Sequence, residues 1–153
     1  MTTRSIRPML AAAAALVLCG APALAVDNMV TAGAPELGAV RTKIKAADYP
    51  GAIADLDAMV RGGVQHADVY NLLGYSLRKT GEVGRAATFY AKALEFDPAH
   101  RGALEYQGEL FVQTGQMDRA KRNLTILAQL CPQGCEERED LARSIAQGAA
   151  ATQ

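Results

Sequence analysis

Two cysteines near the end of the sequence have the types and spacing that most directly suggest chemistry. Cys131 and Cys135 are four residues apart, and the Pro132 and Gly134 between them favour a tight turn. Such a turn brings two thiols within reach of each other, and an oxidising compartment favours a bond between them. We therefore expect a structural disulfide between Cys131 and Cys135, which would fix the docking of the segment that follows.

A thiol-redox or metal-handling role for the same two cysteines is the alternative. Segment 131–135 is similar to the Cys-Pro-x-x-Cys of thiol oxidoreductases, but it has one residue too many and no thioredoxin-like strand and helix around it. Zinc would need two further ligands. His66 and His100 fall in separate predicted loops, where we expect solvent-exposed turn residues, so the sequence predicts no metal site and no cofactor.

Composition excludes several other functions. The chain has 16 basic and 16 acidic residues and no Trp. This balance argues against a nucleic-acid partner, which requires a concentrated basic surface. The sequence also lacks a nucleophile–base arrangement, a phosphate loop and a paired-acid motif, so we expect no enzymatic activity.

The segment 1–25 has the pattern of a secretory signal peptide. Arg4 and Arg7 give a basic start, residues 9–18 are apolar, and the small residues of 23–25 suit cleavage. We therefore expect residues 1–25 to be removed on export to the bacterial periplasm.

Neither a membrane span nor a lipid anchor is expected at this end of the chain. The apolar run is much shorter than the roughly 20 residues that a spanning helix needs, so no stable membrane insertion is predicted after cleavage. Cys19 follows Leu18, whereas the lipid-attachment box of bacterial lipoproteins has a small residue before its cysteine. We therefore expect no lipid at Cys19.

A repeating scaffold must position these chemical groups, because residue types recur along the sequence at a fixed interval of 34 residues, the repeat period. A period shared by several independent columns indicates a repeat architecture. The columns are Ala52, Ala86 and Ala120; Leu56, Tyr90 and Leu124; Gly74 and Gly108; Gly81 and Gly115; and Pro98 and Pro132.

The clearest unit, residues 67–100, resembles the tetratricopeptide repeat. It contains an aromatic residue, Leu-Gly, Ala, a second aromatic residue and a closing Pro; these are Tyr70, Leu73, Gly74, Ala86, Tyr90 and Pro98. The next unit, about 101–134, keeps most of these positions, and the first, about 35–66, is degenerate. The resemblance implies an all-α, right-handed α-solenoid of about three helix-turn-helix units.

Seven helices are expected from the repeat register and from capping signals. They are 35–47, 50–60, 67–80, 83–95, 100–114, 117–130 and a C-terminal capping helix over 136–147. The last begins with several acidic residues, which favour a helix N-terminus. Together they give a repeat domain over 35–147, with a flexible N-terminal segment at 26–34 and a flexible tail at 148–153.

The repeat columns have packing reasons. Gly74 and Gly108 lack side chains and would let the second helix of each unit approach closely, where Ala86 and Ala120 make the reciprocal small contact; the aromatic Tyr90 belongs to the same packing set. A second pair, Gly81 and Gly115, suits a left-handed turn at the end of the first helix. The prolines Pro98 and Pro132 would stop the second helix.

The resemblance also implies a concave groove lined by the first helix of each unit. Following the register, the inward positions are Arg41, Ile44 and Lys45; Asp68, Asn71, Tyr75, Arg78 and Lys79; and Glu105, Glu109, Val112 and Gln113. One end of this set is basic and the other acidic, which could orient a partner peptide. The alternative is that these are the ordinary solvated faces of amphipathic helices.

Tyr75 and Asn71 are the preferred partner-binding residues, since they lie one turn apart on the middle helix. Tyrosine combines apolar area with a polar tip, and asparagine can hydrogen-bond an extended backbone. The carboxylate clamp of some relatives is not predicted, because the third unit lacks its basic residues. The sequence thus predicts a periplasmic scaffold for an unknown protein or peptide partner.

Overall fold

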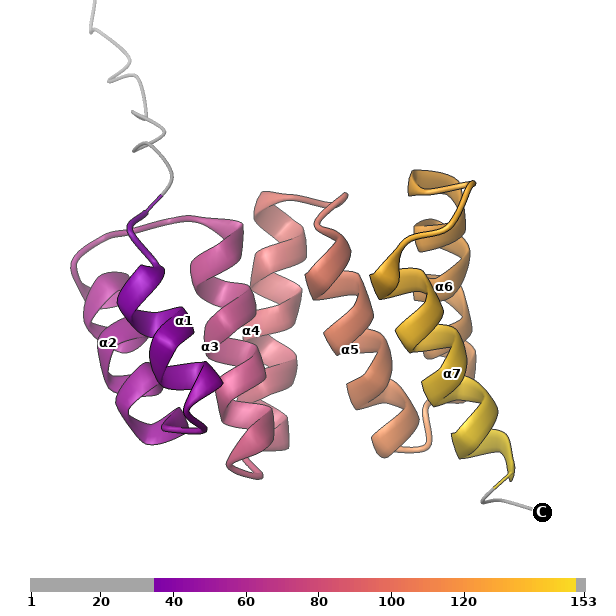
Figure 1. Ribbon diagram of the computed structural model, residues 1–153, viewed down its shortest axis with the longest axis horizontal. Helices are drawn as coiled ribbons and strands as arrows, with labels where there is room; N and C mark the ends of the chain where they lie inside the picture. The colour runs from indigo at the N-terminus through magenta and orange to yellow at the C-terminus, as the bar shows by residue number, and fades with distance from the viewer. Residues whose placement is uncertain (1–34, 151–153) are drawn as a thin grey trace, which may run out of the picture. The chain divides into compact units, whose positions relative to one another are not determined.

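The computed structural model describes residues 35–150, which fold into seven helices joined by short loops (Figure 1). In chain order the helices are α1 (Gly38–Lys45), α2 (Tyr49–Arg61), α3 (Ala67–Lys79), α4 (Val83–Phe96), α5 (Arg101–Gln113), α6 (Met117–Leu130) and α7 (Glu136–Ala150). No strand forms in this range, so the all-α prediction is confirmed. Every helix begins and ends within three residues of its predicted bounds.

Several predictions concern segments that lie outside residues 35–150. These are the signal peptide at 1–25, the segment at 26–34 and the role of Cys19. Of the seven helices that the structure does describe, none is long and apolar enough to cross a membrane.

Consecutive helices pack against each other along the row from α1 (indigo) to α7 (yellow) in Figure 1. Two further contacts, α3 with α5 and α5 with α7, join the first helices of neighbouring units to each other and to the cap. This is the arrangement expected of stacked helix pairs, in which each pair covers the apolar face of the next.

Side chains at the start of three helices satisfy backbone groups that the helix leaves free. Asp48 accepts a hydrogen bond from the Gly51 N–H at 3.0 Å. His66 Nδ1 accepts from the Asp68 N–H at 3.2 Å, and His100 Nδ1 accepts from the Ala103 N–H at 3.0 Å. The prediction that both histidines are simply solvent-exposed turn residues was therefore wrong, because each caps a helix and the His100 side chain is only 15% exposed.

The core runs through the interior of the helix row. Its fully buried side chains include Tyr90, Leu56, Leu73, Leu77, Leu110, Leu127 and Leu141. Burying a leucine side chain contributes roughly 1.5–3 kcal/mol, so this set supplies much of the driving force for folding. Ala86 and Ala120 are also fully buried, where their small size allows close helix approach.

The two glycines of the Leu-Gly column make different contacts. A Cβ at Gly74 would lie 2.8 Å from the ring of Tyr90 in α4, so the second helix of that unit does approach this glycine. A Cβ at Gly108 would lie 2.6 Å from the Leu141 side chain in α7. The closest neighbour of Gly108 is thus the capping helix and not, as predicted, the second helix of its own unit.

The turn after each first helix uses a left-handed residue in the same repeat column. Gly81 and Gly115 have φ of +85° and +73°, as predicted. The degenerate first unit has Ala47 at this position, and it too is left-handed, with φ of +59°. Pro98 and Pro132 lie two residues beyond the ends of α4 and α6, where they end each helix as expected.

Helix α7 extends three residues beyond its predicted end. Helix α7 continues to Ala150, so residues 148–150 are helical instead of belonging to the predicted flexible tail. Gly148 explains the difference, because a Cβ there would lie 2.5 Å from the Val112 side chain and 3.2 Å from Met117. The last turn of α7 thus packs against the end of α5 and the start of α6.

Candidate partner-binding site

The surface shared by α1, α3, α5 and α7, which we call the groove face, contains two cavities. The aromatic cavity, of about 550 Å³, is lined by Arg41, Thr42, Ile44, Lys45, Leu72, Tyr75 and Tyr106. The acidic cavity, of about 300 Å³, is lined by Arg41, Asp68, Asn71, Leu72, His100, Gly102, Glu105, Tyr106, Glu136, Glu137 and Asp140. The two cavities adjoin, because Arg41, Leu72 and Tyr106 line both.

Tyrosine rings form one wall of the aromatic cavity. The ring centroids of Tyr75 and Tyr106 are 4.8 Å apart, and Tyr49 lies edge-on to Tyr75 at 6.2 Å. Burial raises the pKa of Tyr75, and burial together with nearby Glu105 raises the pKa of Tyr106 to about 12. Both hydroxyls are therefore neutral at physiological pH and can donate hydrogen bonds to a bound partner.

Two residues predicted to face a partner bind each other instead. Arg78 donates to the Glu109 carboxylate at 2.5 Å, which links α3 to α5. The Arg78 side chain is 14% exposed, and its guanidinium lies 5.9 Å from the ring centroids of both Tyr75 and Tyr106. The two charges neutralise each other, so this pair contributes little net charge to the groove face. The contacts of Arg78 with both rings help to position the tyrosines.

Glu105 is the most unusual group of the acidic cavity. Its residue is only 7% exposed, and its carboxylate has no hydrogen-bond or ion-pair partner within residues 35–150. Burial raises its pKa to about 8, and the negative charges of Glu109 on α5 and of Asp140, Glu137 and Glu136 on α7 contribute to this rise. A buried carboxyl without a cation favours its neutral form, as this shift shows.

Asn71 and the pair of Asp68 with His100 complete the cavity wall on α3 and at the start of α5. Asn71 is 5% exposed, and its Oδ1 is buried with no donor within the described range. Asp68 Oδ1 lies 3.0 Å from His100 Nε2. Nδ1 of the same ring accepts a hydrogen bond from the Ala103 N–H, so a neutral His100 carries its proton on Nε2. The Nε2–H group then donates a hydrogen bond to Asp68.

The structure brings together most, but not all, of the predicted groove residues. Arg41, Lys45 and Tyr75 line the aromatic cavity, and Asn71 and Glu105 line the acidic one. The remaining predicted positions line neither cavity: these are Arg78, Lys79, Glu109, Val112 and Gln113. Lys79 is exposed, with its ammonium 5.5 Å from the Tyr75 ring centroid.

Several lining residues were missed from the sequence. Leu72 and Tyr106 are one repeat period apart, so they occupy a single repeat column that the register could have revealed. Glu136, Glu137 and Asp140 were interpreted only as favourable charges at a helix N-terminus. Their place in the cavity depends on how α7 docks on α5, and no repeat column predicts that docking.

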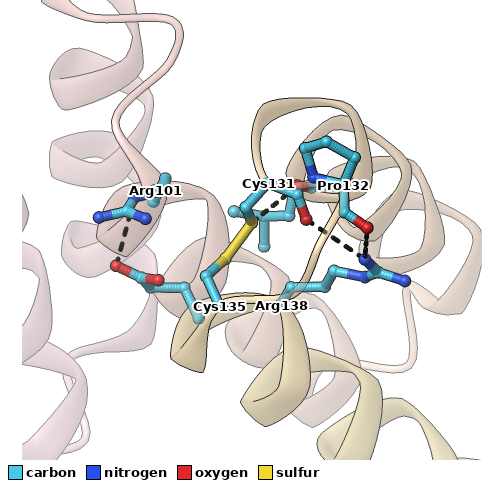
Figure 2. The surroundings of a disulfide bond; sticks show 7 residues. Arg101, Cys131, Pro132, Cys135 and Arg138 are labelled. Carbon is cyan, nitrogen blue, oxygen red and sulfur yellow. Dashed lines mark hydrogen bonds and ion pairs between the residues drawn. A yellow bond between two sulfur atoms is a disulfide. The ribbon is translucent and has the colours of Figure 1, made fainter.

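The cysteine pair lies in the turn between α6 and α7 (Figure 2). Neither cysteine lines the aromatic or the acidic cavity. The sulfur atoms of Cys131 and Cys135 are at bonding distance, 2.07 Å, as the sequence predicts. Arg138 donates to the carbonyl oxygens of Cys131 and Pro132 at 3.3 and 3.2 Å, which ties the turn to α7. Nearby, Arg101 pairs with Glu137 at 3.5 Å.

Known families add one finding about this chain. The family model described as tetratricopeptide repeat matches residues 67–100, the unit that the sequence shows most clearly. No curated protein matches the sequence. Within residues 35–150, no group of three or more His, Cys, Asp or Glu side chains is placed to hold a metal ion.

Proposed function

We propose that this chain is a non-enzymatic scaffold that binds a protein or peptide partner along its groove face, a role that the match of residues 67–100 to the tetratricopeptide-repeat model supports. The observation that carries the proposal is the pair of adjoining cavities on α1, α3, α5 and α7. One is aromatic with basic residues at its edge, and the other is acidic, so a single extended segment can contact both. The tyrosines offer the rigid, amphipathic area typical of interface anchors.

The same proposal places the protein in the bacterial periplasm. Its support is the pattern of residues 1–25, which resembles a signal peptide, and the bonded Cys131–Cys135 pair, which an oxidising compartment favours. Mass spectrometry of the protein isolated from the cell envelope would test this directly. A chain that begins at or near Val26 supports export, and a chain that retains the whole segment 1–25 contradicts it.

The groove face is tested by photo-crosslinking in the native envelope. A photoreactive amino acid in place of Tyr75 should crosslink to a discrete partner that mass spectrometry then identifies. The same amino acid in place of Lys121, an exposed residue on α6 that lines neither cavity, is the matched control. Equal crosslinking from both positions, or none from either, would contradict a partner-binding groove.

Substitution of an anchor residue gives a second test. Tyr75→Ala should weaken binding of the crosslinked partner at least tenfold, as expected for a central aromatic anchor. Phe96→Ala is the control, since Phe96 is an aromatic residue on α4 that is 41% exposed and lines neither cavity. If the two variants lose the same affinity, the effect comes from general destabilisation and not from the groove face.

The alternative function, a thiol-redox or metal-handling role of Cys131 and Cys135, makes different predictions. It requires a pair that is partly reduced in the cell or that carries metal. Thiol titration and metal analysis of the isolated protein distinguish the two functions. A fully oxidised, metal-free pair, together with unchanged partner binding after both cysteines are replaced by serine, eliminates the alternative.

A further inference from the structure

Two acceptor groups in the acidic cavity have no donor from the protein. Glu105 on α5 is buried with no partner for its carboxylate, and Asn71 on α3 is buried with no donor for its Oδ1. They are one repeat period apart, in a single repeat column, and line the same cavity. An unpaired buried acceptor destabilises the folded protein, and a ligand that carries donors would supply the missing hydrogen bonds.

The donors around the cavity are already engaged. His100 donates to Asp68 at 3.0 Å, Arg101 pairs with Glu137 at 3.5 Å, and Arg143 pairs with Asp140 at 2.6 Å. Arg41 lies at the rim, 3.8 Å from Asp68, with a side chain 57% exposed. Of these cationic or donating groups, none is placed to satisfy Glu105 or Asn71.

The charge of the cavity favours a cation. Its lining includes five carboxyl groups, those of Asp68, Glu105, Glu136, Glu137 and Asp140, and the guanidinium of Arg41. Asp68, Glu137 and Asp140 have the partners just described, which leaves Glu105 and Glu136 without a cation among the described residues. A group that carries only donors and a positive charge complements such a lining. Its volume of about 300 Å³ is well above the ~30 Å³ of a water molecule, so it admits a larger group.

The shared wall of the two cavities favours an apolar stem behind that charge. Leu72 and Tyr106 line both cavities and provide an apolar surface at the junction. The side chains of lysine and arginine combine a cationic head with such a stem.

We propose that the acidic cavity is a subsite for a basic side chain, lysine or arginine, of the partner segment that binds along the groove face. This proposal rests on the proposed function and names the chemistry of the partner at that place. Glu105 binds the cationic head as a carboxylate, and Asn71 Oδ1 accepts one of its N–H groups. The methylene stem packs on Leu72 and Tyr106.

Blocked amino acids are suitable probes. N-acetyl-lysine-N-methylamide, N-acetyl-arginine-N-methylamide and the neutral N-acetyl-norleucine-N-methylamide are titrated against the protein, and amide chemical shifts of Gly102, Glu105 and Tyr106 are followed by NMR. At least one basic probe should shift these resonances saturably, and norleucine should not. Equal effects of all three probes, or no saturable shift with either basic probe, would overturn the subsite.

Two variants test the residues that hold the charge. Glu105→Gln and Asn71→Leu should each weaken binding of the basic probe at least tenfold, because the first removes the carboxylate charge and the second removes the unpaired Oδ1 acceptor. Neither should lower the thermal midpoint. Glu139→Gln is the matched control, since Glu139 is an exposed acid of α7 that does not line the acidic cavity. If Glu105→Gln binds the probe as tightly as the Glu139→Gln control does, the assignment is wrong.

The subsite and the proposed function fail separately. Crosslinking of a partner at position 75 without probe binding leaves the scaffold and removes the cationic subsite. Probe binding with no crosslinked partner from position 75 leaves the acidic cavity as a cation-binding site and removes the scaffold. When both succeed, replacing the basic residues of the crosslinked segment one by one should identify one whose loss matches the effect of Glu105→Gln.

Discussion

At the residue scale, Ala47 is the position where sequence and backbone disagree most. It follows α1 with φ of +59°, in the column where the later units have Gly81 and Gly115. A left-handed conformation costs a residue with a Cβ roughly 1–2 kcal/mol, and glycine adopts it freely. The degenerate first unit thus keeps the turn of its neighbours at a cost that they avoid.

Replacing this alanine by glycine should therefore stabilise the protein. We expect Ala47→Gly to raise the free energy of unfolding by about 1 kcal/mol, measured by urea denaturation. The adjacent Ala46 has an ordinary φ of −81°, so Ala46→Gly should lower stability by up to about 1 kcal/mol. Stability that falls equally in both variants would show that the turn gains nothing from glycine.

Glu105 gives a second prediction at this scale, on the pH dependence of stability. Burial raises its pKa from 4.5 to about 8, so between these values the folded protein holds a proton that the unfolded chain has lost. Unfolding then releases a proton, and stability falls as the pH rises from about 4.5 to 8. The charged or titratable groups that line the cavity with it are Arg41, Asp68, His100, Glu136, Glu137 and Asp140, with Glu109 beyond them on α5.

The variant Glu105→Gln removes this contribution. Its free energy of unfolding should decline less between pH 4.5 and 8 than that of the wild type, and it should be the more stable protein at pH 8. Urea titrations at pH 4.5, 6 and 8 measure both effects. A decline as steep as that of the wild type would mean that Glu105 is already ionised in the folded protein across this range.

At the element scale, the docking of α7 on α5 depends on the absence of a side chain at Gly108. A Cβ there would lie 2.6 Å from Leu141, the fully buried side chain that α7 inserts into the core. Overfilling a packed core costs typically about 1–3 kcal/mol. The cap also carries three acids of the acidic cavity, so its displacement would alter the groove face as well as the core.

We expect Gly108→Ala to lower the free energy of unfolding by about 1–3 kcal/mol and to weaken binding of a basic probe. Gly84→Ala on α4 is the control, because a Cβ at Gly84 meets nothing within 4 Å. That variant should be neutral or up to about 1 kcal/mol more stable, since alanine favours helix. If both variants respond alike, close packing on Leu141 does not limit position 108.

The disulfide fixes the other end of the same cap. Cys131 and Cys135 close a very short loop, for which the chain-entropy relation gives a stabilisation of roughly 2 kcal/mol. Replacing both by serine should lower the free energy of unfolding by up to about that amount. Partner binding at the aromatic cavity should stay unchanged, because neither cysteine lines a cavity. Loss of partner binding without loss of stability would instead favour the thiol-based alternative.

Helices were easier to predict than the surfaces they share. The ends of a helix depend on local signals, such as the glycine of each turn and the proline after each second helix. The helix ends predicted from these signals lie within three residues of those in the structure. The pairing of Arg78 with Glu109 joins residues far apart in sequence, and the acids of α7 reach the cavity only through tertiary packing. The repeat register predicted which helices line the groove face but not which of their side chains bind one another.

At the scale of the described repeat domain, the groove face separates two kinds of charge. Arg41 and Lys45 lie at the edge of the aromatic cavity, where the Arg41 side chain is exposed, whereas Glu105 is buried in the acidic cavity. Salt screens exposed charges strongly, with a Debye length of about 10 Å at 0.1 M and about 3 Å at 1 M, and screens buried charges much less. Exposed rim charges mainly change association rates, and buried charge pairs mainly change dissociation rates.

The two ends of the groove face should therefore affect different steps of partner binding. We expect the double variant Arg41→Gln, Lys45→Gln to slow association with the crosslinked partner and to flatten its dependence on salt between about 0.1 and 1 M. By contrast, Glu105→Gln should speed dissociation at least tenfold and leave the salt dependence of association intact. Surface plasmon resonance on the immobilised protein measures both rates. If Glu105→Gln changed only association, the partner's basic side chain would be meeting this carboxylate at the surface and not inside the acidic cavity.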